Sequence, residues 1–338
     1  NKPMRVMNLP AFGLENLSII EQDVPEPGPG EVLVRFGAAA VNYRDYQIVT
    51  GEFAPTADLP IIPCSDGGAT VAAVGDGVTT LAVGDPVAPL FFPEWMRSDP
   101  LTTERSVSVG LEAPGTLRDF GLYLEHQVAK VPGHLSAAEI SCFPCAGLTA
   151  WTALAEVAGV GPGDWVLATG TGGVGIFALQ FAKALGAKVI VVSGSDEKIA
   201  RAEELGADHT INYRKTPEWG LPARELADGI GVRCVVETGG EGTLPQSVAA
   251  LRRNGWVANV GYLAGIGLGL TVYDLIERNA NLHGMSVGHR DGFVAMMDCV
   301  EQHQLRPVIH REYPFVEAPA ALKDIHRGEH FGKLVVTL

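Results

Sequence analysis

The fold follows from the stretch Asp164-Trp165-Val166-Leu167-Ala168-Thr169-Gly170-Thr171-Gly172-Gly173-Val174-Gly175-Ile176-Phe177-Ala178-Leu179-Gln180. A short apolar run typical of a buried strand leads through closely spaced glycines into residues with helical periodicity. In this G-x-G-x-x-G pattern, Gly170 permits the tight turn, Gly172 lets the backbone approach a pyrophosphate, and Gly175 lets the helix pack closely. The first helical residues, Gly173 and Val174, present free N–H groups to phosphate. The stretch therefore predicts a dinucleotide-binding turn.

Outward from this turn, between residues 133 and 287, short apolar runs alternate with helical patterns. Strands alternating with helices predict βαβ units and a parallel, doubly wound sheet, which makes this a Rossmann-like domain of the α/β class. The predicted strands are 165–169, 188–193, 208–211, 233–237, 256–260 and 281–285, and the predicted helices are 173–185, 196–205, 222–228 and 243–253.

The regions on either side of this domain have a different pattern of apolar residues. Residues 1–132 hold short apolar runs interrupted by Gly and Pro, such as 31–36 and 68–75, which favours a β-rich domain. Residues 288–338 hold one predicted helix, 292–303, followed by short β-like pieces. We expect this last part to rejoin the first domain.

The end of the second strand of the Rossmann-like domain predicts which dinucleotide binds. An NAD site usually places an acidic side chain there to accept from the ribose 2′-OH. Here the chain reads Ser193-Gly194-Ser195, which leaves room for a 2′-phosphate, and Lys198 comes shortly after as a charge to pair with it. Asp196 and Glu197 argue mildly for NAD, unless they only cap the next helix. The pattern favours NADP(H).

Composition and charge exclude several classes of protein. The 338 residues carry a formal net charge of −14 with no dense Lys/Arg run, which argues against a nucleic-acid partner. No apolar stretch approaches the ~20 residues of a membrane-spanning helix. The first ten residues do not resemble a signal peptide, so we expect a cytoplasmic protein by default. An odd number of cysteines does not suggest a disulfide framework, and we interpret Cys142 and Cys145 as structural thiols.

Motifs spread over the chain carry a family resemblance. They are Ala39-Ala40-Val41-Asn42-Tyr43-Arg44-Asp45, Ile62-Pro63-Cys64-Ser65-Asp66-Gly67-Gly68, Val83-Gly84-Asp85-Pro86-Val87, Cys145-Ala146-Gly147-Leu148-Thr149-Ala150-Trp151 and Leu205-Gly206-Ala207-Asp208. With the glycine-rich turn, the sequence resembles the medium-chain dehydrogenase/reductase superfamily over nearly its whole length. It is most similar to the zinc-free branch, near the quinone oxidoreductases and zinc-independent alcohol dehydrogenases. The resemblance implies a GroES-like catalytic domain at 1–132 and 288–338, and a Rossmann-like domain at 133–287.

The resemblance also implies coenzyme contacts and an assembly. Lys198 and Tyr213 occupy the places of a Lys and a Tyr that hold the 2′-phosphate in quinone-oxidoreductase-like relatives. The strand at 281–287 often pairs across a dimer in this family, which implies a homodimer. Further implied contacts lie at strand ends and loops that flank the coenzyme, at Thr149, Thr238, Gly261, Tyr262, Ser286, Val287 and Lys333.

The metal ligands of the zinc-dependent relatives are mostly missing. Those relatives use a Cys, a His-Glu pair and a later Cys, whereas this chain has Asn42, Ser65 and Asp66 at the first three places and matches only the last, with Cys145. Catalytic zinc needs about three protein ligands, so we predict that no metal is bound. Residues 91–115, where the relatives carry a structural zinc lobe, contain no Cys.

Without a metal, the substrate oxygen has to be met by side chains, backbone N–H groups or water. By resemblance, Asn42 and Asp45 face the nicotinamide end of the site, and Tyr46 is a candidate proton donor. The alternative is that residues 42–46 form only a capped helical turn. Three functions remain open, namely an alcohol dehydrogenase or carbonyl reductase, a quinone or enone reductase, and an NADPH-binding protein with little turnover. We favour the first, acting on a small to medium apolar substrate.

Overall fold

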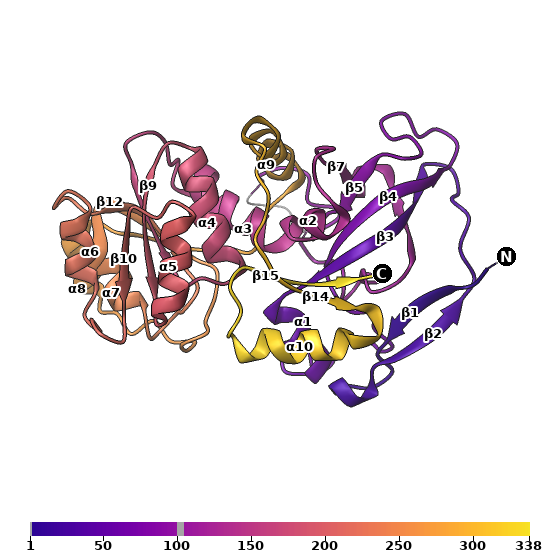
Figure 1. Cartoon of the computed structure of the whole chain (residues 1–338), viewed down its shortest axis with the longest axis horizontal. Coiled ribbons are helices and arrows are strands. Elements are labelled where there is room, and N and C mark those ends of the chain that lie inside the picture. Colours follow the sequence, from indigo (N-terminus) through magenta and orange to yellow (C-terminus); the bar gives the residue numbers. More distant parts are fainter. Residues whose placement is uncertain (1, 100–104) are drawn as a thin grey trace. The chain divides into compact units, whose positions relative to one another are not determined.

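The computed structural model describes residues 2–99 and 105–338, and the chain forms two compact units (Figure 1). The first unit consists of Asn1–Ala146 and Gly288–Leu338, and the second of Gly147–Val287. The sequence predicts a domain start at residue 133, whereas the second unit begins later. The reason is that helix α2 (Ala137–Ser141) packs on strands β3 (Glu31–Val41) and β4 (Asp66–Val74) of the first unit.

The second unit is built on a sheet of six parallel strands, which confirms the predicted fold class. The strand order is β10-β9-β8-β11-β12-β13. This order runs outward in both directions from the first strand, as in Rossmann folds, and ligands bind such sheets where the direction reverses, here between β8 and β11. The strands are β8 (Trp165–Thr169), β9 (Lys188–Ser193), β10 (His209–Asn212), β11 (Val232–Glu237), β12 (Leu251–Asn259) and β13 (Asn281–Gly284).

Helices cover both faces of this sheet (Figure 1). Helix α4 packs on β8 and β9, and α5 packs on β9 and β10. On the other face α7 packs on β11 and β12, with α6 and α8 beside it. Fully buried side chains such as Leu167, Ile190 and Val235 fill the core. The helices are α3 (Leu148–Trp151), α4 (Gly173–Ala184), α5 (Asp196–Glu204), α6 (Gly220–Leu226), α7 (Leu244–Ala250) and α8 (Val272–Arg278), with a π-helical turn at Thr152–Val157.

One helix prediction in this unit was wrong, and one helix was missed. The helix predicted at 243–253 is too long, because α7 ends at Ala250 and the chain turns extended at Leu251, which pairs with Val232. Helix α8 was not predicted. Val272, Leu275 and Ile276 do have helical spacing, but the helix spans only seven residues, which is shorter than the window over which periodicity identifies a helix.

The first unit contains a seven-stranded mixed sheet of order β14-β15-β3-β4-β5-β7, in which β6 also pairs with β3. A separate antiparallel pair joins β1 to β2. The remaining strands are β1 (Met4–Asn8), β2 (Ser18–Gln22), β5 (Pro86–Pro89), β6 (Phe120–Leu124), β7 (Val128–Lys130), β14 (Ile309–Pro314) and β15 (Lys333–Thr337).

Helix α1 (Tyr43–Thr50) packs against α10 (Ala318–Arg327), and α9 (Arg290–His303) packs near β7. The 3-10 turns are Leu14–Asn16, Glu125–Gln127 and Phe315–Glu317, and a π-helical turn spans Phe143–Gly147. Among the helices in the described ranges, none has the length and apolarity needed to cross a membrane.

The strand register of the first unit places the candidate site. Strand β3 ends at Val41, opposite Leu334 of β15, and Ala40 lies opposite Asp66 of β4. The residues just beyond these pairs, Asn42 and Lys333, therefore meet Asp66 where three strands end. Asn42 and Lys333, which are 291 positions apart in the chain, come together in this way.

Candidate functional site

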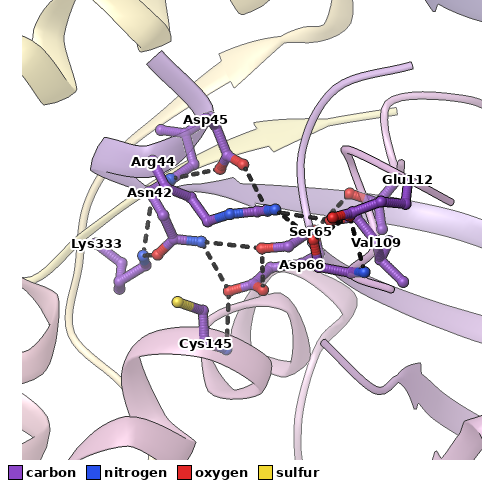
Figure 2. Close-up of polar contacts among 12 residues, drawn as sticks. Asn42, Arg44, Asp45, Ser65, Asp66, Val109, Glu112, Cys145 and Lys333 are labelled. Carbon is purple, nitrogen blue, oxygen red and sulfur yellow. Dashed lines mark hydrogen bonds and ion pairs between the residues drawn. The ribbon is translucent and has the colours of Figure 1, made fainter. Parts of the chain in front are cut away.

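A set of buried polar side chains gathers where these three strands end (Figure 2). The Lys333 ammonium donates to the Asn42 amide oxygen at 2.6 Å and to the Val41 carbonyl at 3.0 Å. The Asn42 amide donates in turn to Asp66 Oδ2 at 3.1 Å. Asp66 also accepts from the Ser65 hydroxyl at 2.8 Å and from the Cys145 backbone N–H at 3.2 Å. All of these side chains except that of Cys145 are buried.

Helix α1 adds an ion pair to this set. The Asp45 carboxylate accepts from the Asn42 backbone N–H at 2.8 Å, which caps the helix, and lies 3.5 Å from Arg44. The Arg44 guanidinium also donates to Ser108 at 2.9 Å and lies over the Phe91 ring, 4.5 Å from its centroid. We call Asn42, Arg44, Asp45, Ser65, Asp66 and Lys333 the buried polar cluster, in which Arg44 alone is half-buried.

The cluster balances its own charge, because Arg44 and Lys333 face Asp45 and Asp66. Burial raises the pKa of Asp45 to about 6, although Arg44 opposes this. Burial also raises the pKa of Asp66, and the Lys333 ammonium and the Asn42 hydrogen bond counteract the rise. The two cations thus help to keep two carboxylates ionised in an interior that disfavours charge.

In the second unit, the glycine-rich turn has the conformation that the sequence predicts. Gly170 takes a φ of 108°, which only glycine adopts readily, and its N–H donates to the Val192 carbonyl at 2.8 Å. A Cβ atom on Gly175 would lie 2.2 Å from the Gly170 carbonyl oxygen, so only glycine lets α4 start this close to the turn. Gly172 caps the helix. The first N–H groups of α4 have no partner within the helix, and such groups bind phosphates.

A second buried network joins the ends of β8 and β11 at the reversal point of the sheet. The Thr238 hydroxyl donates to the Thr169 carbonyl at 2.5 Å, and the Thr169 hydroxyl donates to Glu237 at 2.8 Å. Glu237 is fully buried and also accepts from the hydroxyls of Thr243 and Ser247. This network fixes Thr238, one of the predicted coenzyme contacts, beside the glycine-rich turn.

Both units match known families. Residues 28–135 match the family described as "Alcohol dehydrogenase GroES-like domain", and residues 173–302 match "Zinc-binding dehydrogenase". A zinc-type alcohol dehydrogenase-like protein of Schizosaccharomyces pombe is 39% identical over 333 residues, which cover 96% of each chain. The chain belongs to the medium-chain dehydrogenase/reductase superfamily.

Solved structures agree with this assignment. A provisionally assigned alcohol dehydrogenase of Sinorhizobium meliloti 1021 is 38% identical with a TM-score of 0.93, covering 100% of this chain and 99% of that one. An NAD-dependent alcohol dehydrogenase is 31% identical with a TM-score of 0.88, covering 99% of both chains. A mycobacterial protein complexed with NADPH is 27% identical with a TM-score of 0.80, covering 99% of this chain and 100% of that one. The present chain is an NAD(P)-dependent oxidoreductase of the same superfamily.

The family implies a zinc ion, and the residues of this dehydrogenase do not fit one. Within residues 2–99 and 105–338, no group of three or more His, Cys, Asp or Glu side chains is placed to hold a metal. Both Asp66 oxygens already accept hydrogen bonds. Cys145 is half-buried, and the desolvation of its thiol raises the pKa, which disfavours the thiolate that zinc needs.

Tyr46 is the predicted catalytic residue that lies apart from the cluster. Its ring stacks on His326 of α10, with centroids 4.3 Å apart, and packs against the apolar core of the first unit. Across the described ranges, no hydrogen bond joins the Tyr46 hydroxyl to Asn42 or Asp45. Asn42 and Asp45, the other two predicted catalytic residues, do lie together.

At the end of β9, the predicted 2′-phosphate residues lie near one another in the fold. Ser193 is buried and its carbonyl accepts from the Tyr213 N–H at 3.1 Å. The Ser195 hydroxyl caps α5 by accepting from the Lys198 N–H at 3.3 Å. Lys198 therefore lies in the first turn of α5, and Tyr213, with 43% of its surface exposed, comes directly after β10.

The remaining predicted contacts are spread over both units. Thr149 is buried in α3, and Gly261, Tyr262 and Ser286 lie in loops after β12 and β13. Val287 takes a φ of 53°, which branched residues rarely adopt and which is common at functional sites. Lys333 belongs to the buried polar cluster. The sequence did not predict Ser65 as a polar partner, nor did it predict the buried Glu237.

We expect Asp45→Asn to change how stability depends on pH. Because the folded pKa of Asp45 is about 6, above the ordinary value of about 3.9, ionising it destabilises the fold as pH rises from about 4 to about 6. We therefore compare the free energy of unfolding of the variant with that of wild type at each pH. The difference, variant minus wild type, should be more positive at pH 7 than at pH 4, by up to roughly 3 kcal/mol. Urea unfolding at the two pH values measures this.

Asp119→Asn is the matched control, because the sign is opposite there. Burial opposes ionisation of Asp119, but hydrogen bonds from Arg5 outweigh it and lower the pKa. The free energy of unfolding of Asp119→Asn, relative to that of wild type, should therefore decrease as pH rises. A pH-independent difference for Asp45→Asn would show that Asp45 is not held in the way described.

Proposed function

We propose that this dehydrogenase is a zinc-independent, NADP(H)-dependent alcohol dehydrogenase or carbonyl reductase acting on a small to medium apolar substrate. The observation that best supports it is the buried polar cluster. Its place in the sequence corresponds to the metal-ligand positions of zinc-dependent relatives, and it carries two cations in balance with two carboxylates. A divalent ion added there would meet Arg44 and Lys333 without the thiolates that usually neutralise it.

When bound, the coenzyme supplies or accepts the hydride. The chain's own groups bind and orient it through the glycine-rich turn and the first N–H groups of α4. Negative charge that develops on the substrate oxygen is best stabilised by fixed, desolvated donors. Lys333 has three N–H donors, and two of them donate to Val41 and Asn42. We propose that the third is such a donor.

Preference for NADP(H) rests on the residues at and after the end of β9. No acidic side chain stands at Ser193 or Gly194 to accept from a ribose 2′-OH. Lys198 and Tyr213 lie close to this strand end. Thr149, Gly261, Tyr262, Ser286 and Val287 complete the proposed coenzyme contacts, and the proposal includes a homodimer joined along the edge strand β13.

Reduction of a quinone or an enone is the main alternative, because hydride then lands on a different atom of a similar substrate. An NADPH-binding protein with little turnover is the alternative of another class. Neither changes the expected coenzyme site.

The first test is oxidation of NADPH and of NADH by chelator-treated protein, with aldehydes, ketones, quinones and enones as substrates. We expect turnover with aldehydes or ketones, a preference for NADPH, and no loss of rate on chelation. Loss of activity with the chelator, restored by zinc, would overturn zinc independence. Binding of NADPH without turnover of any substrate would favour the binding protein.

Tyr46→Phe tests the proton donor. If the Tyr46 hydroxyl delivers the proton, removing it should lower turnover by about 100-fold and leave NADPH affinity unchanged. Tyr43→Phe, which removes a hydroxyl from the same helix beside His326, is the control and should keep its rate. Unchanged turnover in Tyr46→Phe would remove Tyr46 from the mechanism and leave the proton to the cluster.

Lys198→Ala tests the coenzyme preference. An ammonium that pairs with the 2′-phosphate interacts with NADPH but not with NADH. We therefore expect the dissociation constant for NADPH to rise by about tenfold, with that for NADH unchanged. Equal weakening of both coenzymes would assign Lys198 a structural role.

A further inference from the structure

The Arg214 guanidinium lies at the carboxyl end of β9, directly over Gly194. A Cβ atom on Gly194 would lie 2.9 Å from Arg214 Nε and 2.6 Å from the Tyr213 hydroxyl oxygen. The two side chains thus converge at the strand end where an NAD site of this fold usually places an acidic side chain. Arg214 was not among the residues expected from the sequence.

The backbone holds both side chains in this position. Asn212, the last residue of β10, pairs in register with Ser193 of β9. The Tyr213 N–H then donates to the Ser193 carbonyl at 3.1 Å, and the Arg214 N–H donates to the Asn212 side chain at 2.9 Å. The turn after β10 is therefore fixed against the end of β9.

The positive charge of Arg214 is not neutralised by its acidic neighbour. Asp196 pairs instead with Lys215, whose ammonium donates to Oδ2 at 2.7 Å, and its Oδ1 accepts from the Asn212 amide at 2.8 Å. In the described part of the chain, the Arg214 guanidinium and the Tyr213 hydroxyl have no hydrogen-bond or ion-pair partner. Two unpaired donors that face the same point are suited to an anion with several acceptor oxygens.

We propose that Arg214, together with Tyr213 and in addition to Lys198, binds the phosphate monoester at the 2′ position of NADP(H) and contributes to selectivity over NAD(H). The inference rests on the proposed coenzyme. The adenosine ribose of a dinucleotide lies at the end of the second strand in this strand order, which is β9 here. A guanidinium contacts a phosphate through two parallel N–H donors, whereas a ribose hydroxyl offers it no charge to pair with.

Gly194 contributes by leaving this space free. An acidic side chain there would meet Arg214 and Tyr213, so it would either displace them or pair with the guanidinium. Selectivity thus depends on Arg214, which follows β10, and on the absence of a side chain at Gly194, which follows β9.

The test measures binding to the full-length protein without substrate, for wild type, Arg214→Met and Lys215→Met. The ligands are NADPH, NADH, 2′,5′-ADP, 5′-AMP and inorganic phosphate. Lys215→Met removes the same charge one residue away, from a side chain already paired with Asp196. Thermal unfolding without ligand shows whether each variant is folded.

We expect Arg214→Met to weaken NADPH and 2′,5′-ADP by about tenfold or more, with NADH and 5′-AMP unchanged and Lys215→Met close to wild type. Equal weakening of both coenzymes, or equal effects of the two variants, would overturn the inference. So would loss of inorganic phosphate binding alone, because the site would then take a free anion. If wild-type protein binds NADH as tightly as NADPH, the proposed coenzyme itself fails, whatever the Arg214 variant does.

Discussion

The Lys333 ammonium lies 2.6 Å from the Asn42 amide oxygen in a part of the first unit with almost no solvent. An ion in such surroundings costs several kcal/mol unless close partners compensate it. The partners of Lys333 are Val41 and Asn42, which are far from it in sequence. Strand β15 therefore has to lie beside β3, with its first residue just beyond Val41. The position of the C-terminal strand is therefore determined by a polar requirement as much as by its apolar residues.

The same requirement links the ionised groups of the cluster to one another. Arg44 offsets Asp45, and Lys333 offsets Asp66. Loss of one cation would leave a buried carboxylate without compensation, and that carboxylate would take up a proton. A metal centre would need the opposite arrangement, with anionic ligands around a cation. The proposed zinc-independent function rests on this difference in the arrangement of charges.

The sequence predicted those features that depend on local patterns. Gly170 and Gly175 fix the turn and the start of α4, and the alternation of apolar runs locates all six strands of the second unit. It failed where long-range contacts decide. Leu251 has helical neighbours, yet it extends because it pairs with Val232. The partnership of Lys333 with Asn42 spans 291 positions, and no local pattern reports it.

The coenzyme site shows the same distinction on a smaller scale. Asp196 is the acidic residue nearest to the end of β9 in sequence, and by itself it favours NAD. In the fold its carboxylate accepts from the Asn212 amide and pairs with the Lys215 ammonium, so its negative charge is balanced by that cation. Within the described residues, the Arg214 guanidinium at the same strand end has no acidic partner. A coenzyme interacts with the charged groups that remain unpaired after the side chains have paired with each other. The sign of this remaining charge can differ from the sign that the sequence of the loop suggests.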